Sequence, residues 1–132
     1  MSRVIHVAVG VVRRGDGKIL IARRPKHLHM GGLWEFPGGK VEAGETVQQA
    51  LSRELREEVA IEVQELQPLV EIRHEYPEKS VLLDTWLVTA FSGEPEGCEG
   101  QETAWATVQG LENYQFPDAN QAIIKAIQTV EN

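Results

Sequence analysis

Three glutamates, Glu54, Glu57 and Glu58, stand three and four positions apart along the chain. On a helix these spacings place the carboxylates within reach of one another on one side. Ionised carboxylates so close together repel, and a hard divalent cation removes that cost because it takes oxygen ligands. Mg²⁺ in particular favours a few carboxylates completed by substrate phosphates over a closed protein cage. The spacing therefore indicates a divalent-cation site that receives a phosphorylated substrate.

The segment around these glutamates carries its own helix-start signal. Thr46 followed by Gln49 has the spacing of a capping box. A helix is predicted over residues 47–59, because the segment is rich in Ala, Leu, Gln, Arg and Glu. One side of this helix would carry Val47, Ala50, Leu51, Glu54 and Glu58. The carboxylates continue a stripe that begins with apolar residues, so we expect them to face the protein rather than solvent.

Taken alone, three glutamates are typical of a charged, solvated helix face. The wider pattern favours a functional interpretation, because it has fixed spacing: Gly39-x5-Glu45-x7-Arg53-Glu54-Leu55-x-Glu57-Glu58-x-Ala60-Ile61. Arg53 lies one turn before Glu57 and can hold that carboxylate in an ion pair. Pro37-Gly38-Gly39, just upstream, is expected to bring the backbone close to a bound ligand, since glycine permits tight approach.

Length and composition limit the possible functions. With 132 residues, 42% of them hydrophobic, the chain is predicted to form a single domain over residues 1–132. A single cysteine, Cys98, cannot form an internal disulfide, and no signal peptide or membrane-spanning apolar segment is recognisable. We therefore expect a cytoplasmic protein with no membrane partner.

The net charge of −7 is unevenly distributed. Residues 1–40 carry eight Lys or Arg against two Asp or Glu, whereas residues 41–132 carry five against eighteen. An acidic chain is poorly suited to duplex nucleic acid, which needs many phosphate contacts. A small phosphorylated ligand could instead lie between the basic first third and the acidic, cation-loaded helix.

Strands and helices are expected to alternate along the chain. Apolar runs and turn signals predict strands over residues 4–12, 18–24, 34–36, 62–76, 80–91 and 103–108. The turn at residues 14–17 suggests that the first two strands form a hairpin. A final amphipathic helix over residues 120–130 is expected to bury Ala122, Ile123, Ile127 and Val130. This mixture implies an α/β (α+β) fold with a central mixed sheet covered by helices.

The spaced pattern resembles the Nudix box of enzymes that cleave nucleoside diphosphates linked to another group. Ala60 departs from it, because the family has a glycine there that usually closes the helix in a left-handed conformation. The resemblance extends to the MutT branch, whose members hydrolyse oxidised dGTP. It rests on Val7-Ala8-Val9-Gly10, Arg23-Arg24, His29-Met30, Glu35-Phe36-Pro37-Gly38-Gly39-Lys40, Gly93-Glu94-Pro95, Glu99-Gly100-Gln101 and Phe116-Pro117-Asp118-Ala119-Asn120. The resemblance implies a Nudix-type α/β/α sandwich and a role in nucleotide-pool sanitation and mutation avoidance.

The resemblance also implies roles for the matched positions. Mg²⁺, with Mn²⁺ as a possible substitute, would be held by the Gly38 carbonyl and by four catalytic carboxylates: Glu54, Glu57, Glu58 and Glu99. The nucleotide would be bound by Arg24, His29, Glu35, Phe36, Pro37, Gly38, Lys79 and Asn120. Lys79 stands where the family prototype has an arginine, so a planar two-pronged contact would be lost. Asn120 has two interpretations: its amide reads the base, or it caps the last helix.

The reaction implied is metal-assisted attack of water on a phosphorus of a nucleoside triphosphate, with Glu54 or a neighbouring acid accepting the proton. Attack at the β-phosphorus would release nucleoside monophosphate and pyrophosphate. One alternative is a Nudix hydrolase of another nucleotide, such as a pyrimidine nucleotide or a dinucleoside polyphosphate. The others are a non-catalytic module, like the domain that reads oxidised guanine in adenine DNA glycosylases, and a protein-binding domain on the same fold. The oligomeric state is left open.

Overall fold

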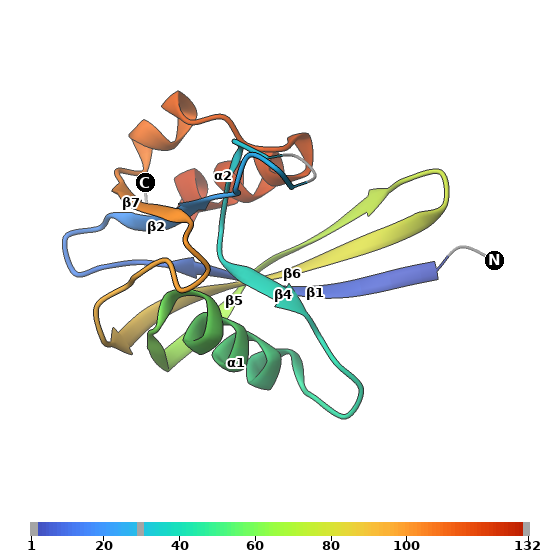
Figure 1. The fold of residues 1–132 in the computed structure, drawn as a ribbon, viewed down its shortest axis with the longest axis horizontal. Helices are drawn as coiled ribbons and strands as arrows, with labels where there is room; N and C mark the ends of the chain where they lie inside the picture. The colour runs from blue at the N-terminus through green and yellow to red at the C-terminus, as the bar shows by residue number, and fades with distance from the viewer. Residues whose placement is uncertain (1–2, 29–30, 131–132) are drawn as a thin grey trace.

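The computed structural model describes residues 3–28 and 31–130, which form a mixed β-sheet between two helical layers (Figure 1). The larger sheet has the order β4-β1-β6-β5, and a smaller antiparallel sheet has the order β3-β2-β7. The elements are β1 (Arg3–Val12), β2 (Ile19–Arg23), β3 (Trp34–Glu35), β4 (Gly38–Lys40), α1 (Val47–Val59), β5 (Glu62–Glu75), β6 (Lys79–Ser92), β7 (Glu102–Ala106) and α2 (Gln121–Val130). This confirms the α+β fold with a central mixed sheet.

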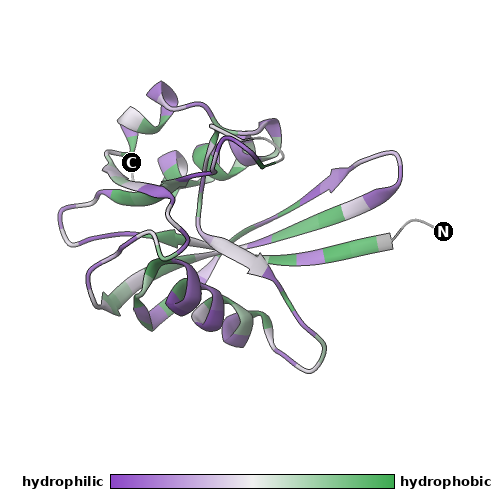
Figure 2. Ribbon diagram, in the orientation of Figure 1, coloured by the Kyte–Doolittle hydropathy of each residue, from purple (hydrophilic) through white to green (hydrophobic). Residues whose placement is uncertain are grey.

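Strand β1 lies inside the larger sheet, and its second half, residues 8–12, is buried on both faces. It pairs in parallel with β6 along its whole length and antiparallel with β4 over residues 7–9. Ala8 and Val12 pack on the α1 side, and Val9 and Val11 pack on the α2 side. Figure 2 shows hydrophobic residues along most of β1, as expected for a strand covered on both faces.

The predicted hairpin of the first two strands is wrong. β1 and β2 belong to different sheets, and an isolated antiparallel bridge between Arg13 and Ile19 is what joins them. One edge of β1 pairs with β6 along its whole length, and the other edge pairs with β4 over residues 7–9, so little of β1 is left for β2. After the turn the chain crosses into the smaller sheet, where β2 pairs with β3 and β7.

Helix α1 begins and ends as its sequence predicts. The Thr46 hydroxyl accepts from the Gln49 N–H at 3.1 Å, and the Gln49 side chain accepts from the Thr46 N–H at 2.9 Å. Ala50 and Leu51 are fully buried against the larger sheet. The helix ends at Ala60 in the left-handed conformation, with φ of 61°. Both helix boundaries are therefore encoded locally.

Helix α2 buries a different face from the predicted one. Ile123 and Ile127 are buried as expected, but Ala122 is exposed and the exposed fraction of Val130 is 52%. Ile124 is buried in place of Ala122, since an isoleucine removes more apolar area from water than an alanine. Within the described residues 3–28 and 31–130, the helices are too short or too polar to cross a membrane.

Candidate active site

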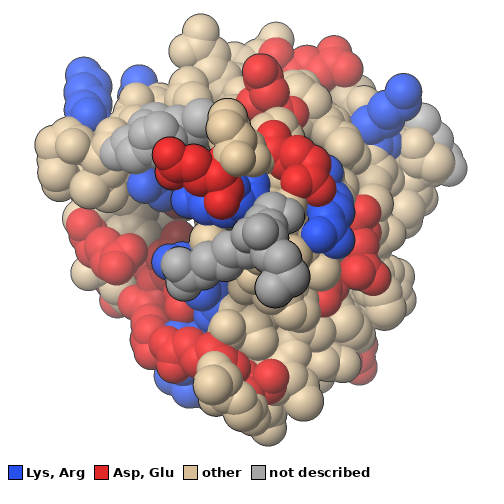
Figure 3. Space-filling view, turned by 90° about the vertical axis from the view of Figure 1, so that its right-hand side faces the viewer, with Lys and Arg blue, Asp and Glu red and all other residues tan. Residues whose placement is uncertain are grey.

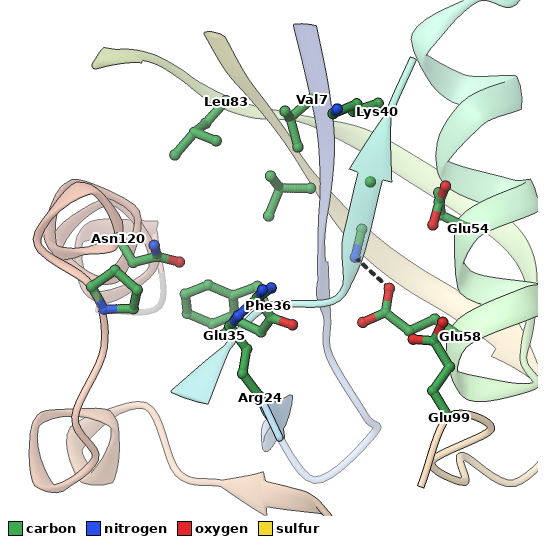
Figure 4. Close-up of a pocket in the computed structure, with 14 residues that line it drawn as sticks. Val7, Arg24, Glu35, Phe36, Lys40, Glu54, Glu58, Leu83, Glu99 and Asn120 are labelled. Atoms are coloured by element: carbon green, nitrogen blue, oxygen red, sulfur yellow. Dashed lines mark hydrogen bonds and ion pairs between the residues drawn. The ribbon is translucent and has the colours of Figure 1, made fainter. Parts of the chain in front are cut away.

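A cavity of about 350 Å³ opens between α1 and α2, above one face of the larger sheet (Figure 4). Its size falls in the range of small-molecule binding sites. Figure 3 shows a hollow in the molecular surface. Acidic side chains gather beside it, and Lys or Arg side chains also border it. The cavity is lined by Val7, Val9, Arg24, Glu35, Phe36, Gly38, Gly39, Lys40, Glu54, Glu58, Leu83, Glu99, Pro117 and Asn120.

Glu58 projects from the last turn of α1 toward the start of β4. Its carboxylate accepts a hydrogen bond from the Gly38 N–H at 3.2 Å. Burial and, to a smaller extent, the negative charges of Glu35, Glu99 and Glu54 together raise the pKa of Glu58 to about 8, although the hydrogen bond from the Gly38 N–H opposes the shift. In the absence of a cation, this carboxyl therefore binds a proton near neutral pH.

Glu54 lies one turn earlier and is held by Arg53. The Arg53 guanidinium donates to Glu54 at 2.8 Å and to both carboxylate oxygens of Glu45 at 2.8 and 2.9 Å. The hydrogen bond from Arg53 lowers the pKa of Glu45 to about 2. Arg53 also donates to the Lys40 carbonyl at 3.2 Å, so it joins α1 to β4 and to the turn before the helix. These contacts explain why Glu45 and Arg53 belong to one spaced pattern.

Glu57 takes a different position from its two neighbours. Its side chain is 60% exposed and lies 3.5 Å from Arg53, which is the i, i+4 pair expected from the sequence. Glu57 is outside the set of residues that line the cavity. Of the three helical glutamates, Glu54 and Glu58 therefore meet at the cavity, together with Glu99 from the loop before β7 (Figure 4).

The opposite wall of the cavity combines one ion pair with aromatic rings. Arg24 and Glu35 are paired at 3.3 Å, and burial raises the pKa of Glu35 despite this partner. Phe36 stacks on Phe116 with 5.1 Å between ring centroids. Asn120 closes this end, and Figure 4 shows its amide projecting from the start of α2 toward Phe36. This wall therefore combines the apolar surface of the aromatic rings with the hydrogen-bond donor and acceptor of the Asn120 amide.

Asn120 itself lies in a short 3₁₀ turn, Asp118–Asn120, that runs directly into α2. Its N–H bonds to the Pro117 carbonyl at 2.9 Å. The backbone is therefore already helical at Asn120, whereas a helix cap has extended geometry. This position argues against the capping interpretation of Asn120.

A second cavity of about 210 Å³ continues from the first toward the β5–β6 hairpin. It adds His74 and Tyr76, whose rings meet edge to face with 4.6 Å between centroids, and also Val81 and Ala119. These residues, together with Val7, Val9 and Leu83, were not among the binding residues predicted from the sequence. Alternation along β1 and β6 could have shown which side chains share a face, but not that this face meets α2.

Two residues expected to bind substrate, Pro37 and Lys79, are not among those that line the two cavities. Pro37 is buried, and its carbonyl accepts from the Gly10 N–H at 2.8 Å, so it shapes β4 from behind the cavity. Lys79 is exposed at the tip of the β5–β6 hairpin, with its ammonium 6.0 Å from the Tyr76 ring centroid. His29 falls outside the described residues.

The donor set fits a divalent cation that is completed by a ligand. Glu54, Glu58 and Glu99 supply carboxylates to one cavity, and hard cations prefer such oxygens. Within residues 3–28 and 31–130, no three acidic, histidine or cysteine side chains lie close enough together to hold a metal ion by themselves. An open site of this kind suits a cation that also takes oxygens from a bound phosphate or from water.

The whole chain can be compared with known proteins. A family model for the NUDIX domain matches residues 8–126. The 8-oxo-dGTP diphosphatase of Escherichia coli K12 is 41% identical and covers 94% of this chain and 96% of its own length. The CTP pyrophosphohydrolase of the same strain is 35% identical and covers 97% of this chain and 94% of its own.

A solved MutT structure, described for Aliivibrio salmonicida and Vibrio cholerae, has a TM-score of 0.85 at 43% identity. The match covers 97% of this chain and 99% of that one. The family model, the relatives and the solved structure all point to the same family as the acidic helix and the cavity beside it. On these grounds the chain belongs to the NUDIX domain family and is a Nudix hydrolase.

Proposed function

We propose that this Nudix hydrolase converts 8-oxo-dGTP to 8-oxo-dGMP and pyrophosphate, using Mg²⁺ or in its place Mn²⁺. The observation that carries the proposal is the cavity itself. Glu54, Glu58 and Glu99 line one end of it, Asn120 lines the other end, and Phe36 lies between them. Such a cavity can hold a triphosphate at the acidic end and a base at the other. Relatives with 41% identity over most of the chain are named 8-oxo-dGTP diphosphatases.

Divalent cations bound at the acidic end would neutralise the phosphates and make bound water a better nucleophile. The carboxylates of Glu54, Glu58 and Glu99 would hold them, with the Gly38 carbonyl nearby and Glu57 joining if its side chain turns inward. Glu54 or a neighbouring carboxylate would accept the proton of the attacking water. Arg53 keeps Glu54 in place through its 2.8 Å hydrogen bond.

The base would lie between Phe36 and the start of α2, within reach of Asn120. Oxidation at C8 of guanine converts N7 from an acceptor into an N–H donor. The amide oxygen of Asn120 can accept from that N–H, while its NH₂ group serves a neighbouring acceptor. Normal dGTP would place two acceptors face to face, and an unpaired buried polar group costs about 1–3 kcal/mol. This contact alone would favour the oxidised nucleotide.

The net charge and the single cysteine of the chain bear on its partners and its location. The substrate is a small nucleotide, and the net charge of −7 speaks against duplex nucleic acid as a partner. Cys98 is free and exposed, which fits a reducing, cytoplasmic environment.

A substrate panel tests the proposal directly. Rates with 8-oxo-dGTP, dGTP and CTP are compared in Mg²⁺, in Mn²⁺ and after EDTA, with CTP included because one relative is named for it. We expect 8-oxo-dGTP to have the highest kcat/KM and EDTA to abolish activity. Higher kcat/KM for CTP or dGTP, or activity that survives EDTA, would contradict the proposal.

Asn120→Ala tests the base contact. We expect it to lower kcat/KM for 8-oxo-dGTP far more than for dGTP, while the metal requirement stays. Asn113→Ala is the control, because Asn113 is an exposed asparagine in another 3₁₀ turn. Equal losses for the two nucleotides would mean that the base is read elsewhere.

Hydrolysis in ¹⁸O-water locates the attacked phosphorus. We expect the label in pyrophosphate, which means attack at the β-phosphorus. Label in the monophosphate would move the attack to the α-phosphorus, and inorganic phosphate as the first product would exclude pyrophosphate release.

A further inference from the structure

The loop between β6 and β7, which carries Glu99, is fastened to the end of α1. The Val59 carbonyl accepts from the Glu96 N–H at 3.1 Å, and the Glu58 carbonyl accepts from the Cys98 N–H at 3.1 Å. The last carbonyls of a helix have no partner within it. The loop supplies those donors, so its position follows the C-terminal end of α1.

One side chain strengthens this attachment in a specific way. The Gln101 Nε2 group donates to the Glu58 carbonyl at 3.1 Å, and its Oε1 atom accepts from the Glu99 N–H at 2.8 Å. Both partners are backbone groups of fixed polarity, so the orientation of the amide is determined. A single half-buried side chain thus joins the backbones of two residues whose carboxylates line the same cavity (Figure 4).

The loop is shaped to bring these groups together. A Cβ at Gly97 would lie 1.9 Å from the Gln101 carbonyl oxygen, so the chain can cross over Gln101 only at a glycine. The Gly100 N–H bonds to the Gly97 carbonyl at 2.9 Å, and Gly100 has φ of 81°. Glu99 therefore sits in a tight turn whose two ends meet at Gln101.

We propose that Gln101 is a positioning residue that sets the placement of the Glu99 carboxylate relative to Glu58. The inference rests on the proposed function, because that function assigns catalytic work to these two carboxylates. A glutamine has both the length and the two polarities needed. A glutamate at position 101 would place a carboxylate oxygen, which cannot donate, against the Glu58 carbonyl oxygen. An asparagine would be one methylene shorter than glutamine.

Gln101→Met removes both hydrogen bonds while nearly preserving side-chain volume. We expect kcat to fall about 10-fold or more with a smaller change in KM, because loss of a group that orients a ligating carboxylate has effects of this size. Gln67→Met, at an exposed site on β5, is the control and should leave both constants unchanged. Normal kcat in Gln101→Met would overturn the proposal.

A double-mutant cycle separates positioning from a general loss of stability. If Gln101 acts through Glu99, then Gln101→Met should cost much less when added to Glu99→Gln than it costs alone. Fully additive losses would mean that Gln101 acts independently of Glu99, and the proposal would be wrong.

Two further measurements need no turnover. In the cation-free protein, Gln101→Met should speed hydrogen exchange of the amides over residues 96–101 and leave exchange in α1 unchanged. It should also weaken Mn²⁺ binding, measured without nucleotide, by about 10-fold. If the unaltered chain hydrolyses none of the nucleotides, the proposed function fails, and these two measurements still decide the proposal. Unchanged exchange and unchanged Mn²⁺ affinity would overturn it.

Discussion

The carboxylate of Glu54 lies against the backbone of Gly39, so closely that a Cβ at Gly39 would be 2.3 Å from the Glu54 carboxyl carbon. A side chain at residue 39 would therefore push the Glu54 carboxylate out of this position, although the backbones of β4 and α1 could stay in place. Arg53 holds the same carboxylate with a 2.8 Å hydrogen bond. The fixed spacing from Gly39 to Glu54 thus reflects a direct contact between the two residues.

Gly39→Ala tests this contact. The new methyl group would displace the Glu54 carboxylate, and we expect kcat/KM to fall about 10-fold or more, since small misplacements of catalytic groups have large effects. Gly15→Ala is the control, because a Cβ at Gly15 meets no atom within 4 Å. Steady-state kinetics and a thermal melt of both variants separate a local displacement from misfolding. Normal kinetics in Gly39→Ala would show that Glu54 does not need this position.

The three helical glutamates should not be equivalent. Glu54→Gln and Glu58→Gln each remove a charge from the cavity, and each should lower kcat by about 10²-fold or more. Glu57→Gln should cost clearly less, because that side chain is 60% exposed and pairs with Arg53. Measuring kcat for the three variants tests this expected order. A loss of kcat in Glu57→Gln equal to that in Glu58→Gln would show that Glu57 turns inward during catalysis.

The stability of the cation-free protein should depend on the protonation of Glu58. Its pKa is raised to about 8 by burial, whereas an unfolded glutamate titrates at about 4.3. The folded state thus favours the protonated form, so this stabilisation is complete below pH of about 4.3 and is lost as pH rises through about 8. In EDTA, Tm should therefore fall as the pH is raised from about 6 to about 9.

Glu58→Gln should lose most of that decline, because glutamine does not titrate. Glu57→Gln is the matched control and should keep it. Melting curves over the pH series measure the difference. The same decline in Glu58→Gln as in the unaltered chain would assign the effect to other groups.

Among the residues that the structure describes, Ala60 is the only one other than glycine with a positive φ. It ends α1 with φ of 61°. Its Cβ is strained there, so Ala60→Gly should stabilise the protein by about 0.5–1 kcal/mol. Ala122→Gly offers a control of opposite sign, because Ala122 is exposed in α2 and glycine costs about 1 kcal/mol in a helix. Urea midpoints compare the two. Destabilisation by Ala60→Gly would mean that the strain is relieved elsewhere.

The sequence by itself determined the structures that depend on neighbouring residues. The capping box at Thr46 and Gln49 and the helix up to Val59 appear as predicted, and Ala60 takes the left-handed conformation that the family glycine usually has at this place. The strand around Ala8 was likewise evident from its apolar run, and β5 and β6 match the strands predicted over residues 62–76 and 80–91. Each of these depends on local hydrogen bonds, backbone preferences or side-chain periodicity.

Only the tertiary structure decided which side chains share the cavity. Glu57 and Glu58 are adjacent in the sequence, and the rotation of α1 against β4 is what turns one inward and leaves the other 60% exposed. Leu83 lines both cavities because β6 pairs in parallel with β1 beneath α2. Strand order and helix rotation are set by the packing of segments far apart in the chain, which no local pattern encodes. For the same reason, the link from Gln101 to Glu58 and Glu99 became evident only in the folded chain.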